Sequence, residues 1–275
     1  MKTVCELCPR HCALSEGATG ICRGRGNRNG VIVPLNYGKI TSIALDPIEK
    51  KPLYHFHPGE QILSVGSFGC NLKCPFCQNH SISMAGVDTD YEEISVDTLV
   101  KLALKLRHEG RNIGVAFTYN EPLISYEFVH DVSVELKKYS LCSVLVTNGQ
   151  IMTDKMEKLL PYIDAMNIDL KGFSQEFYDY VKGDFETVKN IIRLCFAKTH
   201  VELTTLIIPD KNDSEEMMDE EARFIASLSD EIPLHISRFF PRFKVLDRAP
   251  TSVEIIKRLC KIARGHLKYV YKGNV

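Results

Sequence analysis

The residues best suited to chemistry are concentrated in one short segment, which carries Cys70, Cys74 and Cys77 in a C-x3-C-x2-C spacing. A [4Fe–4S] cluster has four irons and usually takes four cysteine ligands, so three thiolates would leave one iron open to a small molecule. Gly69 lets the backbone come close to such a cluster, and Pro75 stiffens the loop between the last two cysteines. The alternatives are a zinc knuckle that lacks its fourth ligand, or a set of buried thiols.

The other cysteines are unevenly distributed. Of ten in the chain, four fall within residues 5–22, and Cys142, Cys195 and Cys260 stand alone. Clustered cysteines in a reducing compartment favour metal binding over disulfides, whereas the three isolated ones are typical of buried thiols.

The N-terminal group consists of Cys5, Cys8, Cys12 and Cys22, set among Gly and Pro turns, and its spacing is typical of a tetrathiolate metal site. So short a polar segment needs a staple in order to fold. Zinc and a second iron–sulfur cluster both accept four thiolates, so the sequence leaves these two open. His11 could replace one cysteine as a ligand, and a solvent-facing histidine is the alternative.

Length and composition are those of an ordinary soluble globular protein, with 275 residues, 44% hydrophobic and 25% charged. A formal net charge of −1 gives no overall electrostatic argument for nucleic acid or an anionic membrane. The absence of a long apolar run or a secretory h-region predicts a cytoplasmic protein without a membrane span. We expect a cysteine-rich metal-binding segment over 1–30, a strand-turn and aromatic linker over 31–61, and the main domain over 62–275.

Strands and helices alternate through the main domain. Strands are expected at 62–66, 114–118, 142–147, 164–169, 201–208 and 234–239, with helices between them, and a last edge strand near 267–271. Such alternation implies right-handed βαβ units and a parallel sheet. Six units are too few for a closed (β/α)8 barrel, so the predicted fold is α/β, an open (β/α)6 partial TIM barrel with chemistry at the C-terminal strand ends.

Two segments ahead of the barrel carry further expectations. Residues 31–35 and 40–45 are expected to be short strands joined by a hairpin-like turn. The aromatic segment 51–59 precedes the cluster strand, which suggests that it packs over the mouth of the active site. There His55 or His57 could contact substrate or handle a proton, and the alternative is that both merely pack.

Polar residues stand at the expected strand ends. Glu121 precedes a proline that starts a helix, Asn148 precedes a turn glycine, and His235 lies in the last strand. Asp169 and Lys171, two apart on a strand, point to the same side and can both face the barrel mouth. The alternatives are a first-turn helix acid for Glu121, a structural ion pair for Asp169 and Lys171, and a core histidine for His235.

These motifs together resemble the radical S-adenosylmethionine (SAM) superfamily. The family's signature loop binds a [4Fe–4S] cluster through three cysteines, and SAM takes the fourth iron. The resemblance implies that Cys70, Cys74 and Cys77 are the catalytic cluster ligands. It also implies that Phe76 lies against the adenine and that Asn79, just beyond the loop, belongs to the cofactor site.

Two strand ends extend the resemblance. The run Tyr119-Asn120-Glu121-Pro is similar to the family's Gly-Gly-Glu-Pro segment, which holds the amino group of SAM; Tyr119 and Asn120 replace the glycines. The run ending in Asn148-Gly resembles the Asp-Thr-Asn-Gly segment of glycyl-radical-enzyme activases, with Val146 in place of the aspartate.

Two later segments complete it. Asp169-Leu-Lys171 matches the activases' Asp-Leu-Lys, in which the lysine pairs with the SAM carboxylate, and His235 resembles their late histidine that contacts SAM. The resemblance therefore implies cofactor contacts for Asp169, Lys171 and His235.

The chain is most similar to the pyruvate formate-lyase-activase-like branch, and its N-terminal and aromatic segments look most like the AmmeMemoRadiSam-system enzymes. Members of that group often carry a further cysteine-containing tail, which is not found within residues 1–275. The resemblance implies an oxidoreductase that cleaves SAM reductively to a 5′-deoxyadenosyl radical, with a one-electron donor of the flavodoxin or ferredoxin type. Its substrate would be a protein such as a glycyl radical enzyme. The alternatives are an RNA or small-molecule substrate, and a non-catalytic iron–sulfur or zinc-binding protein.

Overall fold

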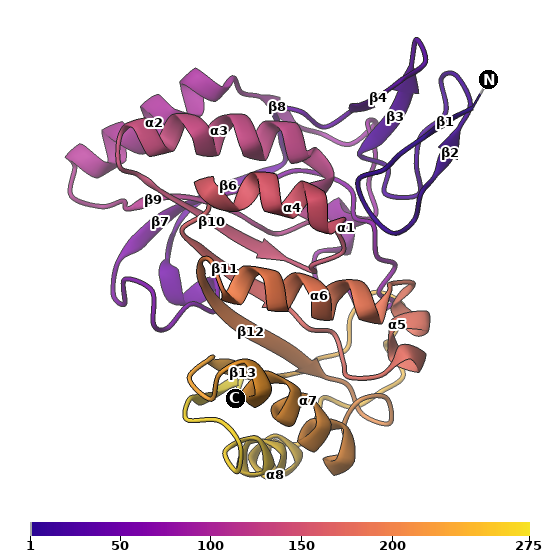
Figure 1. Cartoon of the computed structure of the whole chain (residues 1–275), viewed down its shortest axis with the longest axis vertical. Coiled ribbons are helices and arrows are strands. Elements are labelled where there is room, and N and C mark those ends of the chain that lie inside the picture. Colours follow the sequence, from indigo (N-terminus) through magenta and orange to yellow (C-terminus); the bar gives the residue numbers. More distant parts are fainter. Residues whose placement is uncertain (1) are drawn as a thin grey trace.

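One eight-stranded sheet organises the computed structural model, which describes residues 2–275 (Figure 1). Its strand order is β14-β13-β12-β11-β10-β9-β7-β6, and all neighbours are parallel except β6 and β7. The strands are β6 (Ser42–Pro47), β7 (Gln61–Gly66), β9 (Gly114–Phe117), β10 (Cys142–Thr147), β11 (Ala165–Asp169), β12 (His200–Ile207), β13 (Leu234–Arg238) and β14 (Val270–Gly273). The order is linear from β6 to β14, so the sheet forms an open partial barrel, as predicted.

Helices follow the parallel strands from β7 to β13, and most of them cover the outer face of the sheet (Figure 1). They are α1 (His80–Ser83), α2 (Val96–His108), α3 (Tyr126–Lys138), α4 (Thr153–Leu159), α5 (Gln175–Val181), α6 (Phe185–Phe196), α7 (Glu215–Leu228) and α8 (Val253–Ala263). Short 3₁₀ turns are η1 (Ile48–Lys50), η2 (Pro122–Ser125) and η3 (Leu160–Tyr162). Side-chain caps fix several helix starts; Ser95, for example, accepts a hydrogen bond from the Thr98 amide at 3.1 Å.

The N-terminal part forms small antiparallel pairs beside the barrel. Strand β1 (Thr3–Val4) pairs with β2 (Ala13–Leu14), β3 (Arg25–Arg28) with β4 (Val31–Pro34), and β5 (Lys39–Ile40) with β8 (Glu92–Glu93). The predicted hairpin between 31–35 and 40–45 is wrong, because β4 pairs with the preceding strand β3 and β6 pairs with β7 in the main sheet. The turn that decides this is Asn29-Gly30, where both residues have positive φ, as type I′ hairpins require.

The aromatic segment lies at the N-terminal ends of the strands, opposite the pocket described below. The Tyr54 and His55 amides donate to the Glu202 carboxylate near the start of β12, at 3.0 and 2.7 Å. The Asn167 amide in β11 donates to the Pro52 carbonyl at 2.8 Å. The expectation that this segment packs over the active-site mouth is therefore wrong: it fills the barrel from below.

Two hydrophobic layers hold the fold. The larger lies between the sheet and its helices. The smaller fills the barrel interior and consists of Ile48, Leu53, Ile62, Ala116, Val144 and Ala165. Within residues 2–275, the structure contains no helix that is both long and apolar enough to cross a membrane.

Candidate functional site

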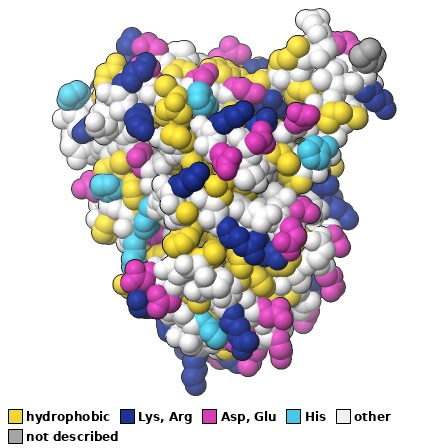
Figure 2. All heavy atoms as spheres, viewed as in Figure 1, with side chains coloured by type: hydrophobic (Ala, Val, Ile, Leu, Met, Phe, Trp, Pro, Cys, Tyr) yellow, Lys and Arg dark blue, Asp and Glu magenta, His cyan; other side chains and the backbone are white. Residues whose placement is uncertain are grey.

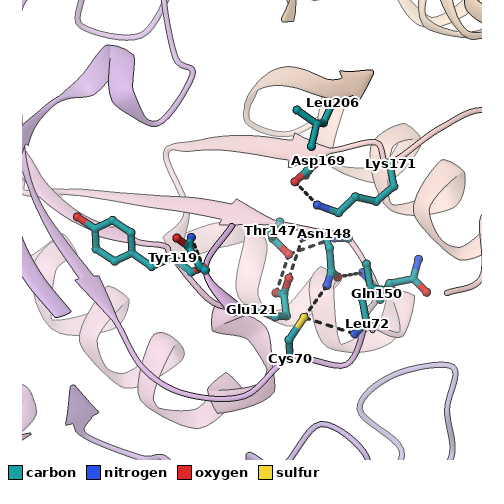
Figure 3. Close-up of polar contacts among 12 residues, drawn as sticks. Cys70, Leu72, Tyr119, Glu121, Thr147, Asn148, Gln150, Asp169, Lys171 and Leu206 are labelled. Atoms are coloured by element: carbon teal, nitrogen blue, oxygen red, sulfur yellow. Dashed lines mark hydrogen bonds and ion pairs between the residues drawn. The ribbon is translucent and has the colours of Figure 1, made fainter. Parts of the chain in front are cut away.

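A pocket of about 270 Å³ opens at the C-terminal ends of the parallel strands. The residues predicted for the cluster and the cofactor line it with the exception of His235: Cys70, Cys74, Phe76, Cys77, Asn79, Tyr119, Asn120, Glu121, Asn148, Asp169 and Lys171. Figure 3 shows Glu121, Asn148 and Cys70 converging from different strand ends, with Lys171 and Asp169 beside them. The site is thus assembled by the fold from segments about a hundred residues apart.

The cysteine loop is fixed by backbone contacts. The Cys70 amide donates to the Cys22 carbonyl at 3.0 Å. Gly69 has φ +88°, and a Cβ there would lie 2.4 Å from that same carbonyl oxygen, so only glycine fits. On the other side, the Asn120 side chain donates to the Phe68 and Gly69 carbonyls at 3.2 and 3.1 Å.

The donor set suits a cationic cluster. Burial, reinforced by the nearby Glu121 carboxylate, raises the pKa of Cys70 well above its ordinary range, and burial raises the pKa of Cys74 to about 12. These thiols therefore become thiolates only against a compensating positive charge. The Leu72 amide and the Asn148 side-chain amide approach the Cys70 sulfur at 3.4 and 3.6 Å, as donors to a ligating thiolate would.

Glu121 joins two strand ends. Its Oε1 accepts from the Leu123 amide at 3.0 Å and the Thr147 hydroxyl at 2.7 Å, and its Oε2 accepts from the Asn148 amide at 2.8 Å (Figure 3). Burial raises its pKa to about 7 despite these donors. Glu121 caps η2, as the helix-acid alternative supposed, and it also faces the pocket.

Asp169 and Lys171 both line the pocket from the end of β11, on the same side as their spacing predicted, and they also form the ion pair that was the alternative (Figure 3). Burial acts to lower the pKa of Lys171, but the Asp169 carboxylate outweighs it and raises that pKa. The other Asp169 oxygen, Oδ1, is buried without a hydrogen-bond partner among residues 2–275, and so is Oγ1 of Thr204. These two residues are register partners on β11 and β12 and both line the pocket, which fits a ligand that carries its own hydrogen-bonding groups.

Tyr119 and Asn120 serve mainly as scaffold. Tyr119 has φ +73°, a conformation that favours glycine, and its hydroxyl donates to Asp46 at 2.8 Å inside the barrel. Asn120 accepts from the Ser67 amide at 3.0 Å, and Asn79 donates to the Tyr119 carbonyl at 2.7 Å. The pocket wall is therefore tied to the cysteine loop on both sides.

Comparison with known proteins places the chain in a family. A family model described as the Radical SAM superfamily matches residues 64–225. The chain belongs to the radical SAM superfamily. It is also 40% identical over its full length to the uncharacterized protein MJ0808 of Methanocaldococcus jannaschii, of which it covers 82%.

Two further proteins are similar to parts of this radical SAM chain. Over 47% of the chain it is 30% identical to pyruvate formate-lyase 1-activating enzyme of Escherichia coli K12, and it spans only 52% of that enzyme. The structure of Streptococcus suis SuiB bound to precursor peptide SuiA matches 75% of the chain and 47% of SuiB, with a TM-score of 0.59 at 13% identity. This radical SAM protein is an enzyme of oxidoreductase type, and its partial-barrel fold is confirmed.

One predicted residue of this radical SAM enzyme lies elsewhere. His235 is buried on β13, where its Nε2 lies 2.7 Å from Glu202 Oε2 and its ring packs edge-on to Tyr54 at 4.6 Å. Burial acts to raise the pKa of Glu202, but hydrogen bonds from His200 and His235 outweigh it and lower that pKa to about 2. The structure thus places His235 as a core histidine and does not bring it to the pocket.

The N-terminal cysteines lie beside the cysteine loop of this radical SAM enzyme, where the Cys22 carbonyl accepts from the Cys70 amide. Cys5, Cys8 and Cys22 are buried and Cys12 is half-buried. Burial raises the pKa of Cys8 to about 11, with a further contribution from the neighbouring Cys22 and Cys5. Among residues 2–275, no three His, Cys, Asp or Glu side chains lie close enough to hold one metal ion, so the ligand sets of both cysteine groups stay predictions.

The sequence did not single out several pocket residues. Thr204, Ser237 and Asn274 line the pocket from β12, β13 and the C-terminal end. A polar residue that alternates with buried apolar ones in a strand was the available signal for Thr204 and Ser237. Asn274 follows β14 with φ +60°, and nothing in its sequence context pointed to the site.

Proposed function

We propose that Cys70, Cys74 and Cys77 hold a [4Fe–4S] cluster and that SAM binds in the adjoining pocket. The observation that supports this most directly is the convergence of the cysteine loop with Asp169 and Thr204, whose buried oxygens lack partners among residues 2–275.

When bound, the cluster and SAM would supply one-electron reductive chemistry, in which an electron from an external donor would cleave SAM to methionine and a 5′-deoxyadenosyl radical able to take a hydrogen atom from a substrate. The chain's own residues bind, orient and exclude water. Lys171 offers its ammonium to the methionine carboxylate as a charge-assisted hydrogen bond, and Asp169 Oδ1 accepts from a ligand donor. Glu121 accepts from the Asn148 backbone amide and so holds that residue in place, while the Asn148 side-chain amide approaches the Cys70 sulfur.

The test is anaerobic reconstitution with iron and sulfide, followed by dithionite and SAM and an assay for 5′-deoxyadenosine. The native chain is expected to form it, and Cys77→Ala is expected to abolish it. The matched control is Cys142→Ala, which removes a thiol at the N-terminal end of β10, the end of the strand away from the pocket. This variant should retain activity. Equal activity of Cys77→Ala and the control would refute the proposal.

We infer a protein as the substrate, activated or modified through a radical, because a relative is named as an activating enzyme and a structural neighbour is described with a bound peptide. The electron would come from a flavodoxin- or ferredoxin-type donor. Incubating the reconstituted enzyme with candidate proteins and following substrate-dependent 5′-deoxyadenosine by mass spectrometry tests this, with RNA and small molecules as the competing substrate classes.

We further propose that Cys5, Cys8, Cys12 and Cys22 bind a metal centre after their side chains turn inward. The mutual proximity of these thiols supports this, since Cys22 and Cys5 contribute to the raised pKa of Cys8. Elemental analysis of a Cys70/Cys74/Cys77→Ala variant distinguishes the two centres. Retained iron indicates a second iron–sulfur cluster, zinc indicates a structural zinc site, and neither metal refutes the proposal.

A further inference from the structure

A second cleft, of about 370 Å³, lies beside the pocket, and Met84 lines both. We refer to it as the basic cleft. Its lining residues are Arg23, Lys73, Pro75, Met84, Tyr180, Lys182, Phe243 and Lys244. Because the two cavities share a wall, a ligand that fills the basic cleft lies next to whatever occupies the pocket.

Four segments far apart in the sequence build this cleft. The Lys73 amide, in the cysteine loop, donates to the Val181 carbonyl at the end of α5, at 2.8 Å. The Lys244 amide donates to the Pro75 carbonyl of the same loop at 2.9 Å. From the N-terminal segment, the Arg23 guanidinium reaches the Met84 sulfur at 3.8 Å. The cleft is therefore part of the ordered structure around the cysteine loop.

Its charge is unbalanced. Four of its eight lining residues are cationic and none is acidic. Among residues 2–275, ion pairs link many lysines and arginines to carboxylates, but Arg23, Lys73, Lys182 and Lys244 take part in none of them. Four like charges around one small cleft repel one another, and an anionic ligand relieves that repulsion.

The walls between the cations are apolar or aromatic. Tyr180 and Phe243 present rings, and Pro75 and Met84 add aliphatic surface. Phe243 is backed by His80, whose ring stacks on it at 4.6 Å, so its position is fixed. This combination suits a ligand that alternates anionic and apolar groups, which is the character of an acidic peptide segment.

Nucleic acid suits the surface less well. On the face drawn in Figure 2, basic and acidic side chains are interspersed, and the chain carries a net charge of −1. Proteins that follow a nucleic-acid backbone usually present an extended basic stripe, with about 6–10 phosphate contacts. A single cleft with four cations offers fewer.

We propose that the basic cleft holds an acidic segment of a protein substrate while the residue to be modified lies in the pocket. This rests on the proposed radical SAM function and on a protein as its substrate, and it assigns the recognition element that the pocket itself does not provide. Carboxylates of the segment pair with Lys182 and Lys244 at the rim, and its apolar side chains pack on Phe243 and Tyr180.

The experiment measures fluorescence anisotropy of a short fluorescein-labelled peptide of Glu and Leu with the reconstituted, full-length enzyme at low and high ionic strength. Lys182→Gln/Lys244→Gln is expected to weaken binding about tenfold. The matched control, Lys257→Gln/Lys261→Gln, removes the same two charges from the exposed face of α8 and should leave binding unchanged. Both lysines of the test variant are exposed, so folding is not at risk.

Single-stranded oligouridylate and inorganic phosphate serve as competing probes. Tighter binding of either one, with the same dependence on Lys182 and Lys244, overturns the proposal, and so does equal weakening by both double variants. Formation of 5′-deoxyadenosine without substrate is measured in parallel. If the native enzyme forms none and yet binds the peptide as expected, the radical function fails while the acidic-segment site stands.

Discussion

Glu121 offers a sharp test of how burial and hydrogen bonding compete in the pocket wall. Its carboxylate accepts three hydrogen bonds, two of them from backbone amides, and burial still raises its pKa from an ordinary value near 4.5 to about 7. In Glu121→Gln the amide oxygen can replace Oε1, but the NH₂ group then faces the Asn148 amide. Two donors facing each other leave a buried amide unsatisfied, at a cost of about 1–3 kcal/mol.

The pH dependence follows from the raised pKa. The pKa of Glu121 is higher in the folded chain than in the unfolded chain, so the folded chain binds the proton more tightly. The stabilisation that this proton gives to the folded chain is fully present below pH 4.5 and is lost as the pH rises through about 7. At about 1.4 kcal/mol per pKa unit, the native chain loses roughly 2–3 kcal/mol between pH 5 and pH 8 that the variant, which cannot titrate, does not lose. The deficit of Glu121→Gln in unfolding free energy should therefore shrink by that amount.

Denaturant unfolding of the metal-free, reduced chain at pH 5 and pH 8 measures the difference. Glu221→Gln is the comparison: burial raises the pKa of Glu221 to about 8, its partner is the Thr205 hydroxyl, and it lies outside the pocket. Both variants should show the same sign. If the Glu221 deficit shrinks while the Glu121 deficit stays constant, the Glu121 carboxylate is not held back from ionising, and the reasoning fails.

Three further outcomes are expected. Gly69→Ala should destabilise the folded cysteine loop by about 1–2 kcal/mol through its positive φ alone, and by more through contact with the Cys22 carbonyl. Bound iron per chain should therefore fall after reconstitution, and full iron loading would contradict this. Lys171→Gln should weaken SAM binding about tenfold or more in equilibrium dialysis, the loss of one charge-assisted hydrogen bond, and an unchanged affinity would remove Lys171 from the SAM site. Hydrogen bonds from His200 and His235 hold the pKa of Glu202 near 2, below its ordinary value. The stabilisation of the folded chain by the ionised Glu202 is therefore present above pH 4.5 and is lost as the pH falls toward 2. The deficit of Glu202→Gln should accordingly shrink on acidification, followed by circular dichroism, and a deficit that grows would refute the assignment.

The barrel could be predicted because local signals agree with one another there. Apolar strands alternate with amphipathic helices, and capping residues such as Ser95 mark the helix starts. Parallel strands then bring their C-terminal ends to one edge, so Glu121, Asn148 and Lys171 meet without any further information.

The errors arise where the pairing of strands, or the partner that a buried side chain finds, decides the outcome. The Asn29-Gly30 turn signals a hairpin between β3 and β4, and it outweighs the longer turn that was expected after residue 35. His235 is the register partner of Thr204, which lines the pocket, but its side chain contacts Glu202 and Tyr54 instead. Ser237, two residues further along the same face of β13, does line the pocket.

The contact between the Cys22 carbonyl and the Cys70 amide has a consequence for synthesis on the ribosome. Synthesis from the N-terminus makes the first cysteine group before its backbone partners: the Cys70 amide donates to the Cys22 carbonyl at 3.0 Å, and the Met152 amide donates to the Leu7 carbonyl at 2.9 Å. Until Met152 has left the exit tunnel, the segment that carries the first thiols lacks backbone partners that it has in the folded chain. The N-terminal cysteine group therefore reaches its final surroundings only after the cysteine loop has been synthesised.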